Sequence, residues 1–160
     1  TRFLLDKSRG ENRELFSDAL TGAYSRRYFE TYLTHMEGME CVEIKIIDVD
    51  HFKQVNDTYG HLAGDVVLKD ITAAIQSCIR STDILIRYGG DELFLLFPQM
   101  SEKHMLKKNE KIKKAVENIV FTEYPDLHVT VSIGGVCGVH PIMEAIHQAD
   151  KLMYENKRML

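Results

Sequence analysis

Residues 83–97 read Asp-Ile-Leu-Ile-Arg-Tyr-Gly-Gly-Asp-Glu-Leu-Phe-Leu-Leu-Phe, and they indicate the central element of the fold. Two runs rich in large apolar residues, at 83–88 and 93–97, flank the tetrapeptide Gly-Gly-Asp-Glu. Strand-like runs on either side of a glycine pair are typical of a β-hairpin. Pro98 follows directly, and because proline cannot donate a backbone hydrogen bond, we expect the second strand to end before it.

The segments outward from the hairpin alternate between strand-like and helix-like patterns. Apolar residues at 41–49 predict a central strand, and a β-branched run at 129–139 predicts another, in which Gly134 and Gly135 indicate a bulge or a close neighbour. Residues 56–64, with Asn-Asp and two glycines, predict turns. Helices are expected over about 25–36, along the apolar stripe Val67, Ile71, Ala74, Ile75 and Cys78, in the lysine-rich segment that ends near 119, and over about 142–157.

The resulting order is strand, helix, strand, strand, helix, strand, helix. It predicts an α/β fold of the α+β type, with a ferredoxin-like βαββαβ core and a mostly antiparallel sheet flanked by helices. In such a core the hairpin tip meets the C-terminal end of the first strand, so Asp48 and Asp91 are expected to lie close together. We expect residues 1–17 to be a helical lead-in from an upstream domain, and residues 18–160 to form the globular domain.

The composition indicates one globular domain. The 160 residues are 44% hydrophobic and 28% charged, which excludes disordered, collagen-like and disulfide-stapled chains. No apolar run approaches the roughly 20 residues that a membrane helix needs. A net charge of −4, from 20 basic and 24 acidic residues, argues against a general nucleic-acid binder. Cys41, Cys78 and Cys137 form no Cys-x-x-Cys pair, so we expect buried reduced thiols in a cytoplasmic domain, with membrane anchoring of the full-length protein left open.

Three acidic residues near the expected meeting point have two interpretations. Taken singly, Asp48 is an ordinary turn or cap carboxylate, and Asp91 and Glu92 are ordinary hairpin residues. Taken together beside Gly89 and Gly90, which let a ligand approach the backbone, they form an oxygen-rich site suited to Mg²⁺. Metal-assisted phosphate chemistry is then the sharper hypothesis.

Six motifs in this chain resemble the GGDEF family of diguanylate cyclases. They are Asp-Ala-Leu-Thr-Gly from Asp18, Asp-Val-Asp-His-Phe-Lys-Gln-Val-Asn-Asp-Thr-Tyr-Gly-His from Asp48, Gly-Asp from Gly64, Arg-Tyr-Gly-Gly-Asp-Glu-Leu from Arg87, Val-Ser-Ile-Gly-Gly from Val131 and Ala-Asp-Lys-Leu-Met-Tyr from Ala149. The resemblance spans nearly the whole chain. It implies a palm-like sheet, related to that of nucleotidyl cyclases and polymerases, on which two GTP molecules are joined into cyclic di-GMP with Mg²⁺ or Mn²⁺ as cofactor.

The resemblance also implies a role for each matching residue. Asp48, Asp91 and the carbonyl of Val49 would hold the divalent metals, and Glu92 would be a further acidic member of the metal and catalytic site. Substrate contacts are implied for His51, Phe52, Lys53, Asn56, Asp65, Gly89, Gly90 and Lys157.

Among these residues, Asn56 and Asp65 would bind the guanine edge, since an amide donates and accepts while a carboxylate accepts two N–H bonds. The amides around His51 and Phe52, with Lys53 and Lys157, would contact phosphates. Without the resemblance, Asn56 is an Asx turn, Asp65 a helix first-turn carboxylate and Lys157 a solvated helix end.

Arg80-Ser81-Thr82-Asp83 resembles the family's R-x-x-D inhibitory site, where product binds away from catalysis. The arginine fork suits a phosphate or a guanine edge. The equally weighted alternative is a surface ion pair at a corner of the chain. A second basic group usually completes such a site, and the sequence does not locate it.

The chain departs from the family pattern at three places. Leu93 stands where the family name has Phe, Ser25 replaces the usual Asn, and the chain ends at Leu160 before the usual Gly-Arg. The expected enzyme is a homodimer in which each protomer holds one GTP and an upstream sensory domain controls pairing. The alternatives are a catalytically silent domain that senses GTP or cyclic di-GMP, and, less favoured by these motifs, cyclisation of a single nucleotide.

Overall fold

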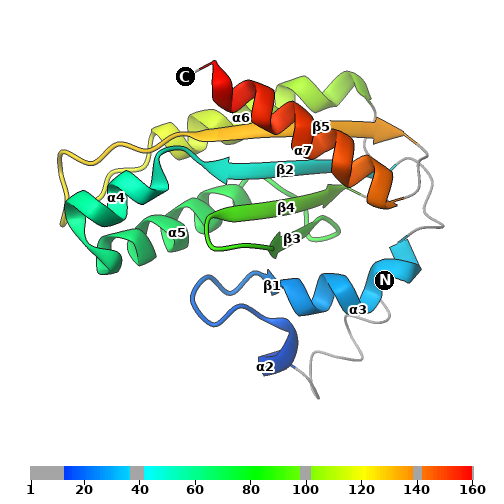
Figure 1. The fold of residues 1–160 in the computed structure, drawn as a ribbon, viewed down its shortest axis with the longest axis horizontal. Coiled ribbons are helices and arrows are strands. Elements are labelled where there is room, and N and C mark those ends of the chain that lie inside the picture. The colour runs from blue at the N-terminus through cyan, green and yellow to red at the C-terminus, as the bar shows by residue number, and fades with distance from the viewer. Residues whose placement is uncertain (1–12, 37–41, 98–101, 139–141, 160) are drawn as a thin grey trace.

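The computed structural model describes residues 13–36, 42–97, 102–138 and 142–159. Its strands are β1 (Tyr24–Ser25), β2 (Val42–Val49), β3 (Ile84–Arg87), β4 (Glu92–Phe97) and β5 (Val131–Gly138). They form one five-stranded sheet in the order β1-β3-β4-β2-β5 (Figure 1). β2 runs antiparallel to β4 and β5, β3 runs antiparallel to β4, and β1 runs parallel to β3. The predicted ferredoxin-like core and its mostly antiparallel sheet are confirmed.

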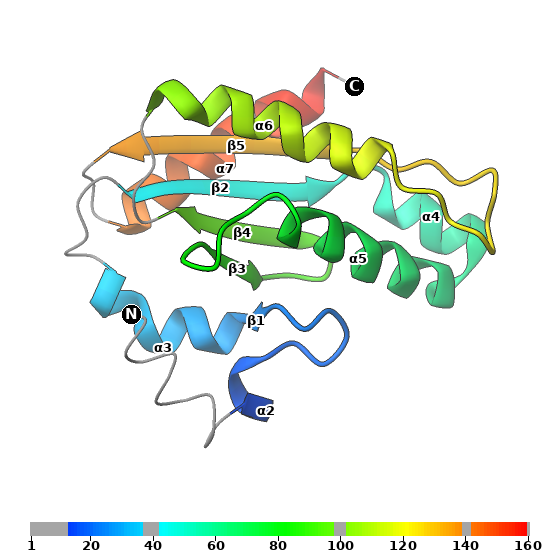
Figure 2. The ribbon, with the colours of Figure 1, turned by 180° about the vertical axis from the view of Figure 1, so that it is seen from behind.

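Helices cover both faces of this sheet. They are α2 (Arg13–Phe16), α3 (Arg26–Met36), α4 (Phe52–Tyr59), α5 (His61–Gln76), α6 (Glu102–Glu117) and α7 (Ile142–Arg158). Apolar residues of α3 and α7 share one buried cluster, and those of α5 and α6 share another. α7 accordingly crosses one face in Figure 1, and α5 and α6 lie on the opposite face in Figure 2.

The central strand β2 is buried on both faces. Ile44 and Ile46 belong to the cluster beneath α7, while Ile47 and Val49 belong to the cluster beneath α5 and α6. Alternate side chains of a strand point to opposite faces, so both sets of side chains in β2 are covered, and its two fully buried charges, Glu43 and Lys45, form an ion pair with each other. Asp48 is the third charged residue of β2, and it lies on the α7 side because its neighbours Ile47 and Val49 face the other way.

The segment 56–64 differs from the prediction. It was expected to consist of turns, but α4 continues to Tyr59 and α5 begins at His61. Only Gly60 separates the two helices, with a φ of 93° that glycine tolerates without strain. The prediction was wrong because Asn and Asp disfavour helix interiors only weakly, and burial of Val55 against the core outweighs that preference.

β1 was not predicted. Its two residues are too few to show an alternating pattern, and they become a strand only by pairing with Ile86 and Arg87 of β3. At β5 the expectation of a bulge or a close neighbour resolves to a close neighbour, since the register with β2 is continuous from Val131 to Gly138. A Cβ at Gly134 would overlap the backbone of α7 at Ala149. Glycine there lets α7 lie directly on the strand.

Two sequence expectations concern burial and membrane spans. Cys78 is a buried thiol, as expected, whereas Cys137 is partly exposed and Cys41 lies outside the described residues. Within the described ranges, no helix combines the length and apolar character needed to cross a bilayer.

Candidate active site at the hairpin tip

The tip of the β3–β4 hairpin meets the end of β2, as the sequence predicts. Asp48 pairs with Glu92 in the strand register, and the backbone N–H of Val49 donates to the carbonyl oxygen of Asp91 at 3.1 Å. The two acidic segments are therefore joined by the sheet itself. This contact places Asp91, at the hairpin tip, next to Asp48, near the end of β2.

Asp48 is a partly buried carboxylate whose negative charge is only partly balanced by a neighbouring lysine. Its side chain is 16% exposed, Oδ2 lies 3.3 Å from Lys157 Nζ, and Oδ1 is buried with no hydrogen-bond partner among the described residues. Burial, followed by the negative charge of Asp91, raises the pKa of Asp48 to about 6, although Lys157 opposes the shift. A buried acceptor left unpaired costs free energy, which a bound cation would offset.

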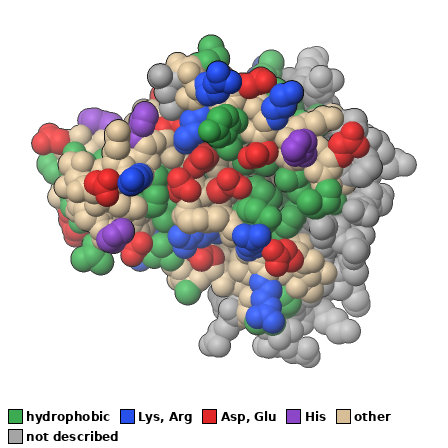
Figure 3. Space-filling model, in the orientation of Figure 1, with side chains coloured by type: hydrophobic (Ala, Val, Ile, Leu, Met, Phe, Trp, Pro, Cys, Tyr) green, Lys and Arg blue, Asp and Glu red, His purple; other side chains and the backbone are tan. Residues whose placement is uncertain are grey.

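The donor set fits a hard divalent cation. It comprises the Asp48 and Asp91 carboxylates and the carbonyl oxygen of Val49, which are oxygen ligands of the kind that Mg²⁺ and Mn²⁺ prefer. In the described part of the chain, no three His, Cys, Asp or Glu side chains gather into a metal-binding group. The structure brings Asp48 and Asp91 together, and Glu92 does not complete a group of three with them. On the face of the molecule seen in Figure 3, acidic side chains gather near the middle, with basic side chains above and below them.

The carboxyl group of Glu92 has charged neighbours that differ in part from those of Asp48. Burial, followed by the negative charges of Asp150 and Asp91, raises the pKa of Glu92, and Arg26 acts in the opposite direction. Because cross-strand partners share a face, Glu92 faces the same side of the sheet as Asp48. Its role in the site stays a prediction.

Gly89 and Gly90 are not required by the hairpin turn itself. Among the described residues, the glycines with a positive φ are Gly22 and Gly60, so neither hairpin glycine adopts the left-handed conformation. A Cβ at Gly90 would meet no atom within 4 Å. The fold leaves space at this position, which fits the approach of a ligand to the backbone.

The segment after β2 turns sharply into α4. His51 has φ 55° and ψ 34°, a left-handed conformation that is uncommon for a residue other than glycine. Phe52 and Lys53 form the first turn of α4, and within the described residues no side chain caps this helix start. Backbone amides that lack such a cap can bind an anion.

Asn56 and Asp65 lie on the adjacent helices α4 and α5. A Cβ at Gly64 would overlap Oδ1 of Asn56, so the Asn56 amide packs directly over the residue that precedes Asp65. Asp65 is exposed in the first turns of α5. The two predicted guanine-binding residues are thus neighbours, and Gly64 makes the space for one of them.

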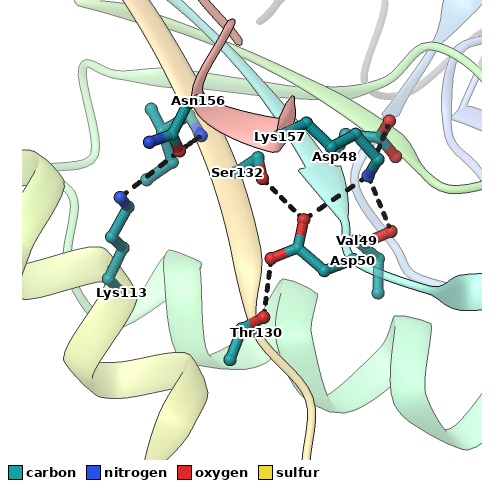
Figure 4. Close-up of polar contacts among 9 residues, drawn as sticks. Asp48, Val49, Asp50, Lys113, Thr130, Ser132, Asn156 and Lys157 are labelled. Carbon is teal, nitrogen blue, oxygen red and sulfur yellow. Dashed lines mark hydrogen bonds and ion pairs between the residues drawn. The ribbon is translucent and has the colours of Figure 1, made fainter. Parts of the chain in front are cut away.

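Lys157 reaches the candidate ligand oxygens of Asp48 and Val49 from the last turns of α7 (Figure 4). Its Nζ lies 3.3 Å from Val49 O and 3.4 Å from Asp50 Oδ1, in addition to the contact with Asp48. Sequence reasoning gave no role to Asp50, although this residue belongs to the same quoted motif. A second aspartate two positions after Asp48 was the signal available, because alternate residues share a face of a strand.

The Arg80–Asp83 segment forms a closed turn. Asp83 Oδ2 accepts the backbone N–H of Arg80 at 2.8 Å, and Asp83 Oδ1 accepts from the Arg80 guanidinium at 3.3 Å. The Asp83 side chain is 0% exposed and that of Arg80 is 54% exposed. At the same corner, Lys108 of α6 donates to the carbonyl oxygen of Cys78 at 2.8 Å. Lys108 thus contacts the chain at Cys78, just before the Arg80–Asp83 turn.

Comparison with known proteins identifies the family. The profile described as "Diguanylate cyclase, GGDEF domain" matches residues 15–159. The chain belongs to the GGDEF family. It is 36% identical over 155 residues to diguanylate cyclase A of Treponema denticola and 34% identical over 154 residues to diguanylate cyclase DosC of Escherichia coli K12. These alignments cover 89% and 91% of the chain, which spans 42% and 34% of the length of these relatives.

Solved structures of GGDEF domains confirm the palm-like fold. Diguanylate cyclase SiaD of Pseudomonas aeruginosa, solved with its activator SiaC, is similar with a TM-score of 0.85 and 29% identity, over 99% of this chain and 64% of that one. The GGDEF domain of DgcB from Caulobacter crescentus, solved with cyclic di-GMP, is similar with a TM-score of 0.80 and 26% identity, over 90% of this chain and 91% of that one.

Proposed function

We propose that this GGDEF domain condenses two GTP molecules into cyclic di-GMP and two pyrophosphates, in a dimer in which each protomer supplies one half-site. The observation that carries the proposal is the buried, unpartnered Oδ1 of Asp48 beside Asp91 at the hairpin tip. A metal cation between these two carboxylates would neutralise the negative charge that Lys157 leaves uncompensated. The relatives named as diguanylate cyclases support the same reaction.

In each half-reaction, the 3′-oxygen of one GTP attacks the α-phosphorus of the other. The 3′-hydroxyl proton passes to water, a bond forms from the 3′-oxygen to the α-phosphorus, and the bond from the α-phosphorus to the bridging oxygen breaks to release pyrophosphate. Bound Mg²⁺ or Mn²⁺ would favour the alkoxide and neutralise the leaving pyrophosphate. Asp48, Asp91 and the carbonyl of Val49 would hold the cation, with Glu92 at the edge of the same site.

The remaining residues of the site would bind and orient GTP. The open helix start at His51 and Phe52, together with Lys53 and Lys157, would contact phosphates. Asn56 and Asp65 would bind the Watson–Crick edge of guanine, and the Gly89-Gly90 turn would let the nucleotide approach the backbone. A single half-site cannot align two nucleotides, so pairing of two protomers is part of the mechanism.

We further propose that cyclic di-GMP binds at Arg80 and Asp83 and inhibits the enzyme. The DgcB domain solved with cyclic di-GMP supports this binding capacity in the family. Lys108 is a candidate for the second basic group, because one arginine cannot neutralise both phosphates of the product. The upstream sensory domain and the cytoplasmic location expected from the sequence also stay predictions.

The proposed function is tested by incubating the artificially dimerised chain with GTP and Mg²⁺ and separating the nucleotides. We expect cyclic di-GMP and pyrophosphate from the parent and no product from Asp91→Ala or Glu92→Ala. The exposed Asp126 on the α6–β5 connection offers a matched control, Asp126→Ala. Nucleotide binding without product in the dimerised parent would favour the silent sensor instead, and product from both hairpin variants would contradict the metal site.

A further inference from the structure

Three oxygen atoms surround the ammonium of Lys157. Its Nζ lies 3.3 Å from Asp48 Oδ2, 3.3 Å from Val49 O and 3.4 Å from Asp50 Oδ1 (Figure 4). The first two are oxygens of the proposed metal ligands. Asp50 is not among these ligands, so its contact with Lys157 needs a separate explanation.

Asp50 is a fixed charge within the fold. Its side chain is 2% exposed, and each carboxylate oxygen accepts a hydroxyl at 2.6 Å, Oδ2 from Thr130 and Oδ1 from Ser132. Its backbone N–H also donates to the carbonyl oxygen of Thr130 at 3.0 Å. Bonds to a charged acceptor are short and strong. The position of Asp50 is therefore set by its contacts with Thr130 and Ser132, which involve no ligand.

The last turns of α7 are also held in place independently of any ligand. Asn156 Oδ1 accepts the backbone N–H of Ile133 at 3.2 Å and the ammonium of Lys113 at 3.4 Å. Gly134 allows the close approach of the α7 backbone to β5. Lys157 follows Asn156 directly, so these contacts fix the position of its backbone. They do not fix the orientation of its long side chain.

We propose that Asp50 is a positioning residue that presents the Lys157 ammonium to the terminal phosphate of the bound nucleotide. This inference rests on the proposed function, in which Lys157 contacts that phosphate. A free lysine side chain samples many rotamers, and ordering it on binding costs free energy. A buried carboxylate that already holds the ammonium lowers this cost. Thr130 and Ser132 contribute indirectly, because their hydroxyls hold the Asp50 carboxylate in place.

The test compares nucleoside triphosphate and diphosphate binding. Calorimetry in Mg²⁺ would measure GDP and a GTP analogue that carries a methylene in place of the α,β-bridging oxygen, and therefore cannot release pyrophosphate. We expect Lys157→Met to lower the triphosphate-to-diphosphate affinity ratio about tenfold, the scale of one charge-assisted hydrogen bond. Asp50→Asn should lower the same ratio about threefold or more, and should cause no further loss in the Lys157→Met background, because two residues that act through one contact are not additive.

Two further variants guard against a loss of folding. Thr130→Val alters an exposed residue and removes the hydroxyl that holds Asp50 Oδ2, so it should shift the ratio in the same direction by a smaller factor. Asp126→Asn makes the same chemical change as Asp50→Asn on an exposed carboxylate and should leave the ratio unchanged. Urea unfolding of each variant checks that it is folded.

Two results would overturn the positioning role alone. One is an unchanged ratio in Asp50→Asn and Thr130→Val while Lys157→Met lowers it. The other is an equal loss from Asp50→Asn with and without Lys157, which would mean that Asp50 acts through the cation or the fold. A parent that binds no GTP would overturn the proposed function itself.

Discussion

Arg87 and Asp18 form an ion pair between residues 69 positions apart, with Arg87 Nη1 at 3.2 Å from both oxygens of Asp18. Nη2 of the same guanidinium donates to the carbonyl oxygen of Gly90 at 3.0 Å. One side chain thus ties the segment before β1 to the tip of the hairpin. Two motifs that are far apart in the sequence form a single structural unit.

The first prediction is that Asp18→Asn destabilises the domain at pH 7. Burial alone would raise the pKa of Asp18, but hydrogen bonds from Thr21 and the charge of Arg87 together hold it below its ordinary value of 3.8. A lowered folded-state pKa stabilises the protein above the unfolded value, and this stability is lost as the pH falls through the folded value. We expect a loss of about 1–2 kcal/mol at pH 7 and a smaller one near pH 3 by urea unfolding. Equal stability of variant and parent at pH 7 would contradict the role of the pair.

The second prediction is that Asp48→Asn stabilises the metal-free protein while abolishing product formation. The pKa of Asp48 is raised from 3.8 to about 6, so the folded state binds more protons than the unfolded state between these values. The free energy of unfolding of the parent therefore falls as the pH rises through this window. Urea unfolding in EDTA should show a gain of about 1–2 kcal/mol for Asp48→Asn at pH 8 and little gain near pH 4. A variant less stable than the parent at pH 8 would refute this reasoning.

The third prediction concerns Gly64. Alanine usually favours a helix over glycine by about 0.5–1 kcal/mol, but here its Cβ would overlap Asn56 Oδ1 and displace the amide. We expect Gly64→Ala, like Asp65→Ala, to weaken GTP binding about tenfold and leave ATP binding nearly unchanged. Calorimetry with both nucleotides provides its own control, since ATP reports the phosphate contacts. Unaltered preference for GTP in both variants would exclude the proposed guanine site.

The fourth prediction separates the two interpretations of Arg80 and Asp83. Asp83→Ala should cost about 1–3 kcal/mol, because a buried turn acceptor is lost, whereas Arg80→Ala should cost only about 0–1 kcal/mol. Arg80→Ala and Lys108→Met should both weaken cyclic di-GMP binding when an uncleavable GTP analogue fills the active site. If titration shows equal binding in parent and Arg80→Ala, the turn is a structural ion pair.

The fifth prediction follows from the two half-sites. Activity per protomer should rise with the concentration of the 160-residue chain and should approach a maximum when the chain is fused to a dimerising segment. Assays over a dilution series, with the oligomeric state followed by light scattering, would measure this. Constant specific activity in samples that remain monomeric would rule out the two-protomer mechanism.

Much of the fold can be predicted from the sequence because its patterns are local. The run before Asp48, the glycine pair of the hairpin and the periodic stripe from Val67 each report the burial of a single element. The order of these elements then leaves few topologies, of which the observed one brings Asp48 to Asp91. β1 and the α4 helix are exceptions, because a two-residue strand has no period and the preferences of Asn56 and Asp57 are weaker than packing.

The tertiary structure decides which charges meet. Nothing local to Asp50 indicates that its carboxylate is held by Thr130 and Ser132, or that it in turn contacts Lys157. Asp83 likewise has the same sequence neighbours whether it caps a turn or binds a ligand. Side-chain partners far apart in the chain are set by strand register and by how closely helices approach the sheet, as at Gly134. These distances are set only when the whole core packs. The motifs therefore indicate which chemical groups the protein uses, and the fold determines how those groups are arranged.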